Sequence, residues 1–450
     1  MLEYFKSMMS NISGGYAELR FQQISRTTII VRNSKVDEII KDSETGGALR
    51  FFSSTGVGFA TFNNPDDLQK VIEKAKEASR LSRNPVKLKD APAIKDSYEP
   101  SPETLIKNIP LEEKIDLIER YSKIAGSHEK ISQVEIQYFE KDLVNYFFSN
   151  DGHEIVEHRP YLIMTMSVTA TDGSIIQTRH KAWGGQKGFK LLKNREQEIE
   201  EMVKTAVDLL KAEPVSGGTY NVILDPAIAG TFIHEAFGHL SEADMIYKNP
   251  IMLEKMKIGK RFGKDLLNVV DDGTIEGEYG FYVYDDEGVK STKTYLIKNG
   301  IFNSRLHSRE TAELLNNELT GNARAVNYTF QPLVRMSITY IEPGNATFEE
   351  MLERVGNGLY VVGASGGETA NEMFTFSAQF AYEIKNGKLG RLIRDVTLSG
   401  NVFETLMNIE MIGNDLEFQS GHCGKMFQMP LPVSTGAPHV MIKNIIVGGR

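Results

Sequence analysis

Cysteine is nearly absent from this sequence, which has 450 residues and a single cysteine, Cys423. One cysteine excludes a disulfide framework within the chain. The same scarcity makes its position informative, because a lone thiol is either a small buried hydrophobe or a group with chemistry such as metal binding.

Long apolar runs are also absent. The longest extends from Pro160 to Ala170, well short of the roughly 20 residues that a membrane-spanning helix needs. Glu3 and Lys6 lie where the apolar part of a signal peptide would be. We therefore expect no membrane association and, by default, a cytoplasmic protein.

An excess of positive charge is the third absence. Lysine and arginine total 51 and aspartate and glutamate total 60, which gives a net charge of −9. Such a chain has no overall attraction to nucleic acids or anionic membranes, so we expect no nucleic-acid partner. The composition is otherwise that of a globular protein, 41% hydrophobic and 25% charged, and the length suffices for about two to four domains.

The first part of the chain, residues 1–84, has the pattern of a small α+β unit. Alternating and clustered apolar residues predict two strands, a hairpin and a helix, at residues 16–22, 27–33, 47–63 and 65–82. Prolines are concentrated in residues 85–109. We expect this segment to be a linker, because proline lacks a backbone donor and blocks regular elements.

Residues 110–215 repeat this theme. A helix from Pro110, several strands and a closing helix that ends before Pro214 are expected. The strand segments are residues 134–140, 143–159, with a turn at 150–152, and 161–170. Strands and a helix therefore occur twice, which predicts two small related α+β units.

Residues 218–450 form the expected third and largest unit. A strand at residues 220–226 leads into a helix, and the sequence beyond Leu266 is rich in strand patterns. Asn-Gly pairs at residues 299–300 and 386–387 lie between apolar runs, which is a strong hairpin signal. The predicted fold class is α+β: two small units followed by a larger, mainly antiparallel C-terminal domain that carries the motif described next.

The most informative motif is His234-Glu235-Ala236-Phe237-Gly238-His239, inside a helix that Asp225 and Pro226 are expected to begin. Two histidines around a glutamate are typical of zinc helices, in which the histidines bind metal and the glutamate activates water. The usual spacing is four residues, about 40° apart on the helix, whereas five residues are about 140° apart. A regular helix could not aim both rings at one ion, so we expect a π-type bulge or a break near Gly238. The alternative is that the two histidines are unrelated, one packed and one solvated.

Cys423 lies in the segment Ser420-Gly421-His422-Cys423-Gly424-Lys425. The flanking glycines favour an exposed turn over the buried position usual for a free cysteine. Two histidines and one thiolate would leave zinc a fourth position for water, the pattern of catalytic sites. His422 is the rival third ligand, and Lys425 is either a positive charge near the metal or a solvated lysine.

These residues give the chain a resemblance to the TldD/PmbA family of metallopeptidases, and the resemblance covers essentially the whole chain. It rests on the motif region and four further segments: residues 224–244, 285–288, 320–324, 335–344 and 421–428. The resemblance implies one zinc ion per chain, held by His234, His239 and Cys423, with Glu235 as the catalytic residue. It also implies unfolded or extended peptides, small proteins or peptide precursors as substrates. The implied assembly is a homodimer or a heterodimer with a PmbA/TldE-type subunit, the branch that lacks the metal motif.

The resulting hypothesis is a zinc-dependent peptidase in which Glu235 deprotonates the attacking water. The alternative is a non-catalytic peptide-binding or regulatory subunit with a structural histidine pair. Glu235 distinguishes the two, because a structural site needs ligands but no base. The acidic run Asp285-Asp286-Glu287-Gly288 lacks the spacing of a calcium loop and is expected to be an acidic turn.

Overall fold

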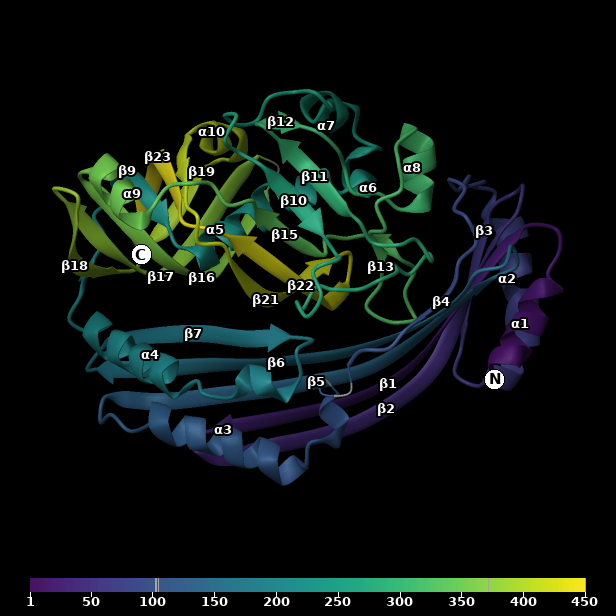
Figure 1. Ribbon diagram of the computed structural model, residues 1–450, viewed down its shortest axis with the longest axis horizontal. Helices are drawn as coiled ribbons and strands as arrows, with labels where there is room; N and C mark the ends of the chain where they lie inside the picture. Colours follow the sequence, from purple (N-terminus) through teal and green to yellow (C-terminus); the bar gives the residue numbers. More distant parts are fainter. Residues whose placement is uncertain (102, 104, 371, 450) are drawn as a thin grey trace.

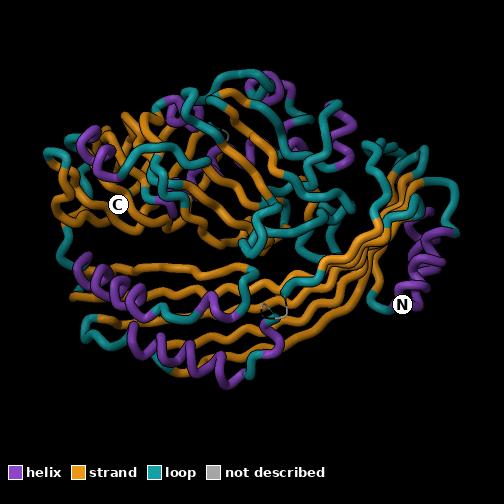
Figure 2. Tube along the Cα trace, viewed as in Figure 1, coloured by secondary structure: helices purple, strands orange, loops and turns teal. Residues whose placement is uncertain are grey.

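The computed structural model describes residues 1–101, 103, 105–370 and 372–449. The N-terminal half forms one long, curved sheet, and the strand-rich C-terminal half lies within its curve (Figures 1 and 2). Helices α3 (Leu111–Ala125) and α4 (Glu196–Leu209) pack on the face of the sheet that is turned away from the C-terminal half. No helix in the described part of the chain is both long and apolar enough to cross a membrane.

The N-terminal sheet has seven strands in the order β3-β2-β1-β5-β6-β4, with β7 also paired to β6. The strands are β1 (Tyr16–Arg32), β2 (Lys35–Phe52), β3 (Val57–Phe62), β4 (Lys95–Tyr98), β5 (Ile131–Ser149), β6 (Glu154–Asp172) and β7 (Ile175–Gly185). The strands expected at residues 16–22 and 27–33 are one continuous strand, β1. The polar break between them stays extended because Arg26 pairs with Asp42 and Glu44 of the neighbouring strand.

Both expected N-terminal units contribute to this single sheet, and each has its own helices. Near one end, α1 (Leu2–Ser10) and α2 (Leu68–Ser82) cover a cluster built around Phe5, Phe21 and Phe51. At the other end, α3 and α4 cover a second cluster. The proline-rich segment also joins the sheet, since its strand β4 pairs in parallel with β6.

Side-chain alternation along β6 explains how the sheet serves two cores. Leu162 and Met164 point to the cluster beneath α3 and α4. Tyr161 and Ile163 point the other way and pack against Tyr279 of the C-terminal half. This two-faced burial agrees with the nearly uninterrupted apolar run at Pro160–Ala170, because a strand buried on both faces has few polar positions.

The C-terminal half contains an eight-stranded and a six-stranded sheet. The eight-stranded sheet holds β8 (Glu213–Pro214), β9 (Gly218–Leu224), β16 (Gly358–Ala370), β17 (Met373–Lys385), β18 (Lys388–Arg394), β19 (Thr397–Asn401), β20 (Ile409–Ile412) and β23 (Val440–Gly448). It closes on itself, because β16 pairs with both β9 and β17. The six-stranded sheet holds β10 (Val269–Asp272), β11 (Lys293–Lys298), β12 (Ile301–Phe302), β15 (Ile338–Ile341), β21 (Glu417–Lys425) and β22 (Gln428–Ala437), and β13 (Ala323–Arg324) pairs with β14 (Leu333–Val334).

The helices of this half are α5 (Pro226–Ile233), α6 (Ala243–Ile246), α7 (Pro250–Lys255), α8 (Arg309–Leu315), α9 (Phe348–Val355) and α10 (Val402–Met407). Most strand pairs are antiparallel, as expected. The two Asn-Gly hairpins are confirmed, because they connect β11 to β12 and β17 to β18. Their asparagines and glycines all have positive φ, which is the backbone that two-residue hairpin turns require.

Buried ion pairs join the two halves. The Arg20 Nη1 atom of β1 lies 3.0 Å from the Asp286 Oδ2 atom, and the Arg50 Nη2 atom of β2 lies 2.8 Å from the Glu287 Oε1 atom. Asp285 accepts backbone N–H groups from its own turn. The acidic run is therefore a turn, as expected, and it is buried between the two halves, because Asp286 and Glu287 pair with arginines of the N-terminal sheet.

Candidate metal centre

The start of helix α5 is determined by two residues at its N-terminus. The Asp225 side chain accepts the backbone N–H of Ile228, and Pro226 occupies the first helical position. The helix then continues into a π-helical turn, η5 (His234–Gly238), and a 3-10 turn, η6 (His239–Ser241). The predicted irregularity is confirmed. A π turn has more residues per turn than an α-helix, so it brings positions five apart onto one side.

The two histidine rings consequently lie next to each other, edge to face. Their centroids are 5.2 Å apart and their planes are inclined by 79°. Gly238 allows this turn to pack closely, because a Cβ atom there would lie 2.0 Å from the Met336 Sδ atom. Helix α5 also lies directly on β22, where Gly230 faces the backbone of Gly436.

Cys423 lies on β21, and the expectation of an exposed turn was wrong. The residue is 4% exposed and pairs with Leu431 of β22. The turn comes later, at Met426 and Phe427, which both have positive φ. The glycines beside Cys423 lie within the strand, because the antiparallel pairing with β22 extends past them to Lys425.

The structure brings three of the expected residues together. One donor atom from each of His234, His239 and Cys423 lies within 4.8 Å of the others. The Cys423 Sγ atom is 3.4 Å from the His239 Nε2 atom. The His234 Nδ1 atom is buried and has no hydrogen-bond partner among the described residues. Two imidazoles and a thiolate are donors typical of zinc sites, so this set of residues fits a metal ion.

The electrostatics of the group favour a metal-binding thiolate. Burial disfavours a charged sulfur, but hydrogen bonds and charge from His234 and His239 lower the pKa of Cys423 to about 4. Burial also disfavours a charged ring, yet Glu242 and Cys423 raise the pKa of His239 well above its usual value. Without metal, a thiolate and an imidazolium therefore face each other at neutral pH.

Glu235 lies beside this group and reaches solvent. Its side chain is 31% exposed, and its Oε2 atom is 3.8 Å from the His239 Nε2 atom. Among the described residues, no group donates a hydrogen bond to its carboxylate. Both oxygens are therefore available to a water or a substrate.

His422, the rival ligand, does not join the group. Its Nε2 atom is 3.0 Å from the hydroxyl of Tyr279, which packs between the C-terminal half and β6. His422 and Cys423 are neighbours on one strand, and successive side chains of a strand point to opposite faces. The His422 side chain therefore points away from the ligand group that contains Cys423.

Glu242, an acidic residue downstream of the motif that favours a metal site, was assigned no role from the sequence, and the role of Lys425 was left open. Glu242 is fully buried, and its Oε2 atom lies 3.1 Å from the His239 Nδ1 atom and 3.0 Å from the Lys425 Nζ atom. Burial opposes its ionisation, but the charges of His239 and Lys425 lower the pKa of Glu242 to about 2. A carboxylate three residues after His239 was a usable signal, because residues three apart are neighbours on a helix.

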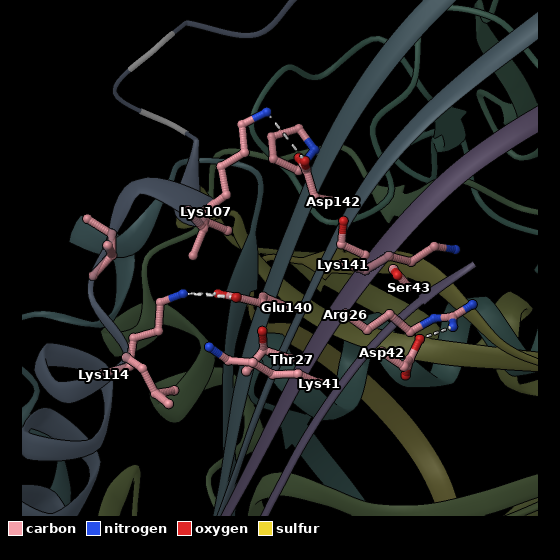
Figure 3. Close-up of a pocket in the computed structure, with 15 residues that line it drawn as sticks. Arg26, Thr27, Lys41, Asp42, Ser43, Lys107, Lys114, Glu140, Lys141 and Asp142 are labelled. Atoms are coloured by element: carbon pink, nitrogen blue, oxygen red, sulfur yellow. Dashed lines mark hydrogen bonds and ion pairs between the residues drawn. The ribbon is translucent and has the colours of Figure 1, made fainter. Parts of the chain in front are cut away.

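Two of the larger cavities in the described part of the chain lie outside this group. One, of about 500 Å³, is bordered by β6, β7, α5, β16 and β21; Thr231 lines it, one helical turn before Glu235. The other, of about 400 Å³, lies on the N-terminal sheet near α3 (Figure 3). Six of its charged side chains form the pairs Lys114–Glu140, Lys107–Asp142 and Arg26–Asp42, and Lys41 and Lys141 line it as well.

Comparison with known families gives three matches along the chain. Residues 17–79 match PmbA/TldA metallopeptidase domain 1, residues 105–212 match the central domain, and residues 217–449 match the C-terminal domain. The last match alone covers more than half of the chain. The chain belongs to the PmbA/TldD metallopeptidase family. It is a metallopeptidase, and it has a metal cofactor.

Relatives of this family member cover three quarters or more of its length. A metalloprotease of Synechocystis is 37% identical over 444 residues, which covers 96% of this chain and 95% of the relative. A metalloprotease of Methanocaldococcus jannaschii is 37% identical over 433 residues, covering 94% and 95%. A zinc metalloprotease TldD homolog of Saccharolobus solfataricus is 34% identical, covering 75% and 76%.

Solved structures share the fold. A putative modulator of DNA gyrase from Thermotoga maritima superimposes with a TM-score of 0.82 at 18% identity, covering all of both chains. TldE from Thermococcus kodakarensis gives a TM-score of 0.80 at 17% identity, covering 99% of this chain and 98% of that one. The arrangement of a curved N-terminal sheet and a strand-rich C-terminal half is thus shared by these proteins.

Proposed function

We propose that this metallopeptidase is a zinc enzyme that hydrolyses unfolded or extended peptides, small proteins or peptide precursors. The observation that carries the proposal is the position of Glu235. Its carboxylate accepts no hydrogen bond among the described residues, lies on the same π-helical turn as His234 and is 3.8 Å from the Nε2 atom of His239, one of the three donors. A ligand group with a partly exposed carboxylate beside it, free of hydrogen bonds, is the arrangement that water activation requires.

Different residues would bind the metal and transfer the proton. His234, His239 and Cys423 would hold the ion. A bound zinc ion would polarise the scissile carbonyl and make an attacking water more acidic. Glu235 takes the proton from that water and then transfers it to the leaving amine. The partial exposure of Glu235 and His239 gives a substrate access to this side of the group.

The cavity lined by Thr231 supports the choice of substrate. It lies between β7 of the N-terminal sheet and β21 of the C-terminal half, alongside the helix that leads to Glu235. A space of about 500 Å³ has room for a few residues of extended chain and not for a folded domain. This favours peptides and unfolded segments.

We further propose that the protein works as a two-subunit particle, either a homodimer or a pair with a PmbA/TldE-type subunit. The likeness in fold to TldE of Thermococcus kodakarensis supports a partner of similar shape. Light scattering of the purified chain, alone and mixed with such a subunit from the same source, decides between the two.

The test of the proposed function is metal content and turnover on one preparation. The purified protein is analysed for bound metal, stripped with a chelator, and assayed on an unstructured fluorogenic peptide before stripping, after stripping and after zinc is restored. Assays are run with and without a PmbA/TldE-type subunit. We expect cleavage that follows zinc occupancy. Zinc-loaded protein that cleaves no peptide in either assay would instead indicate a non-catalytic peptide-binding or regulatory subunit.

A further inference from the structure

We propose that Glu242 and Lys425 are positioning residues of the metal centre: Glu242 fixes the orientation of His239, and Lys425 fixes Glu242. Neither residue is one of the ligands or the base considered above. The inference relies on the proposed function only in requiring that His234, His239 and Cys423 bind a metal ion. It is tested through metal affinity, which is measured without any peptide.

A hydrogen bond joins Glu242 to His239. The His239 Nδ1 atom faces the Glu242 carboxylate at 3.1 Å, while the Nε2 atom faces the Cys423 sulfur at 3.4 Å. An ionised carboxylate can only accept a hydrogen bond, so it selects the ring form with a proton on Nδ1. The lone pair of Nε2 is then directed at the ligand group. Such carboxylate–histidine pairs raise ligand basicity and fix ring orientation in metal sites.

Glu242 is held in place by two hydrogen-bond donors besides His239. Its Oε1 atom accepts the backbone N–H of Met336 at 3.3 Å, and its Oε2 atom accepts from Lys425 at 3.0 Å. The side chain of Glu242 is fully buried, and a buried carboxylate without a charge partner would be costly. Lys425 supplies that partner.

Lys425 is in turn held by its own hydrogen bonds. Its ammonium group donates three hydrogen bonds, to Glu242, to the Asp244 Oδ1 atom at 2.6 Å and to the Val334 carbonyl at 2.8 Å. Its side chain is 4% exposed. All three donors are therefore used, and the ammonium group is fixed at one place.

The arrangement connects the two sequence-distant sides of the centre. Lys425 is the last residue of β21, the strand that carries Cys423, whereas Glu242 follows the turn that carries His239. The Lys425–Glu242 pair therefore fixes the strand of the thiolate against the turn of the imidazole.

The experiment measures zinc affinity of the full-length protein by competition with a chromophoric chelator. We expect Glu242→Ala to weaken zinc binding by about 10- to 100-fold. Glu242→Gln keeps the size and one acceptor oxygen but loses the charge, and we expect a loss of about tenfold. Cobalt-loaded Glu242→Gln should retain the sulfur-to-cobalt charge-transfer band, because Cys423 remains a ligand. Loss of that band would show that Glu242 maintains the whole ligand set, and would overturn a role confined to His239.

The role of Lys425 is tested by a double-variant cycle. Lys425→Met should weaken zinc binding about tenfold in the wild-type background. If Lys425 acts through Glu242, the same substitution should change affinity by less than about threefold in the Glu242→Gln background. Equal losses in both backgrounds would show that Lys425 acts on the metal centre by another route, and that step of the proposal would be wrong.

A matched control separates positioning from general destabilisation. Lys114 and Glu140 form another buried pair, at 2.8 Å, on α3 and β5 of the N-terminal half (Figure 3). Lys114→Met removes a buried cation just as Lys425→Met does, but we expect unchanged zinc affinity. The proposal is overturned if Glu242→Ala binds zinc within about twofold of the wild type, or if Lys114→Met weakens binding as much as Lys425→Met. Wild-type protein that binds zinc but cleaves no peptide would refute the proposed function and leave this inference intact.

Discussion

The Nε2 atom of His239 lies 3.4 Å from the Sγ atom of Cys423, although the two residues are 184 positions apart in the chain. The π-helical turn supplies the imidazole, and a buried strand supplies the sulfur. The contact is possible because α5 packs directly on β22, the partner strand of β21.

Glu235→Gln should lower peptide turnover by about 10²- to 10⁴-fold while zinc content stays at the wild-type level. The amide keeps the size of the side chain but cannot accept a proton from water at neutral pH. Turnover and zinc content are measured on the same sample. Glu318→Gln, at a highly exposed glutamate, is the control and should be fully active. A near wild-type rate for Glu235→Gln would exclude this residue as the base.

Cys423→Ser should lose most bound zinc and most activity, because serine is not ionised at neutral pH and cannot replace the thiolate. His422→Ala should keep both, since the His422 ring contacts Tyr279 and not the ligand group. Zinc is quantified by elemental analysis after gel filtration. The reverse result would assign the ligand role to His422.

Zinc binding at pH 7 should release about one proton per chain. The pKa of metal-free His239 is raised well above its usual value, because Glu242 and Cys423 outweigh the opposing effect of burial. The ring is therefore protonated at pH 7, and it must lose the Nε2 proton to bind metal. Cys423 contributes no proton at this pH, because its pKa is about 4.

The release should diminish as the pH rises through the pKa of His239, where the ring is already neutral. Below about pH 4, protonation of the thiolate should add to the protons released and weaken binding further. Calorimetric titrations in buffers of different ionisation enthalpy give the proton count. A count of zero at pH 7 would contradict the predicted charge state of His239.

Gly238→Ala should destabilise the protein by about 1–3 kcal/mol and reduce zinc occupancy. The added methyl group would meet the buried Met336 sulfur at 2.0 Å. Chemical denaturation and zinc content are measured for both single variants and the double variant. In a Met336→Ala background the same substitution should cost little, because the alanine leaves space for the methyl group. An equal cost in both backgrounds would show that the glycine is needed for the π-turn backbone itself.

Asp286→Asn should lower the free energy of unfolding by about 3–5 kcal/mol, because it leaves the buried Arg20 guanidinium without its charge partner. Arg20→Met combined with Asp286→Leu should cost less than Asp286→Asn alone, since no unpaired charge remains.

Urea denaturation is measured with and without added calcium. Stabilisation of the wild type by calcium would show that the acidic run is a cation site after all.

Much of the fold could be predicted from local patterns. The capping of α5 by Asp225, the apolar face of α2 and the Asn-Gly hairpins depend on residues close in sequence, and the structure has all three. The two N-terminal units were also recognised as α+β, but their common sheet was not. The domain boundaries expected at residues 85, 110 and 218 stay predictions.

The sequence alone determined the motif, the irregular helix and the identity of the one thiol, because each follows from residue type and spacing. The tertiary structure decided that Cys423 is buried in a strand, that His422 points elsewhere, and that Lys425 reaches Glu242 across 183 residues. The physical reason is that helix periodicity, capping and turn chemistry act over a few residues. A buried ion pair or a ligand set depends instead on which distant strands and helices pack together, and that packing is determined by the whole core at once.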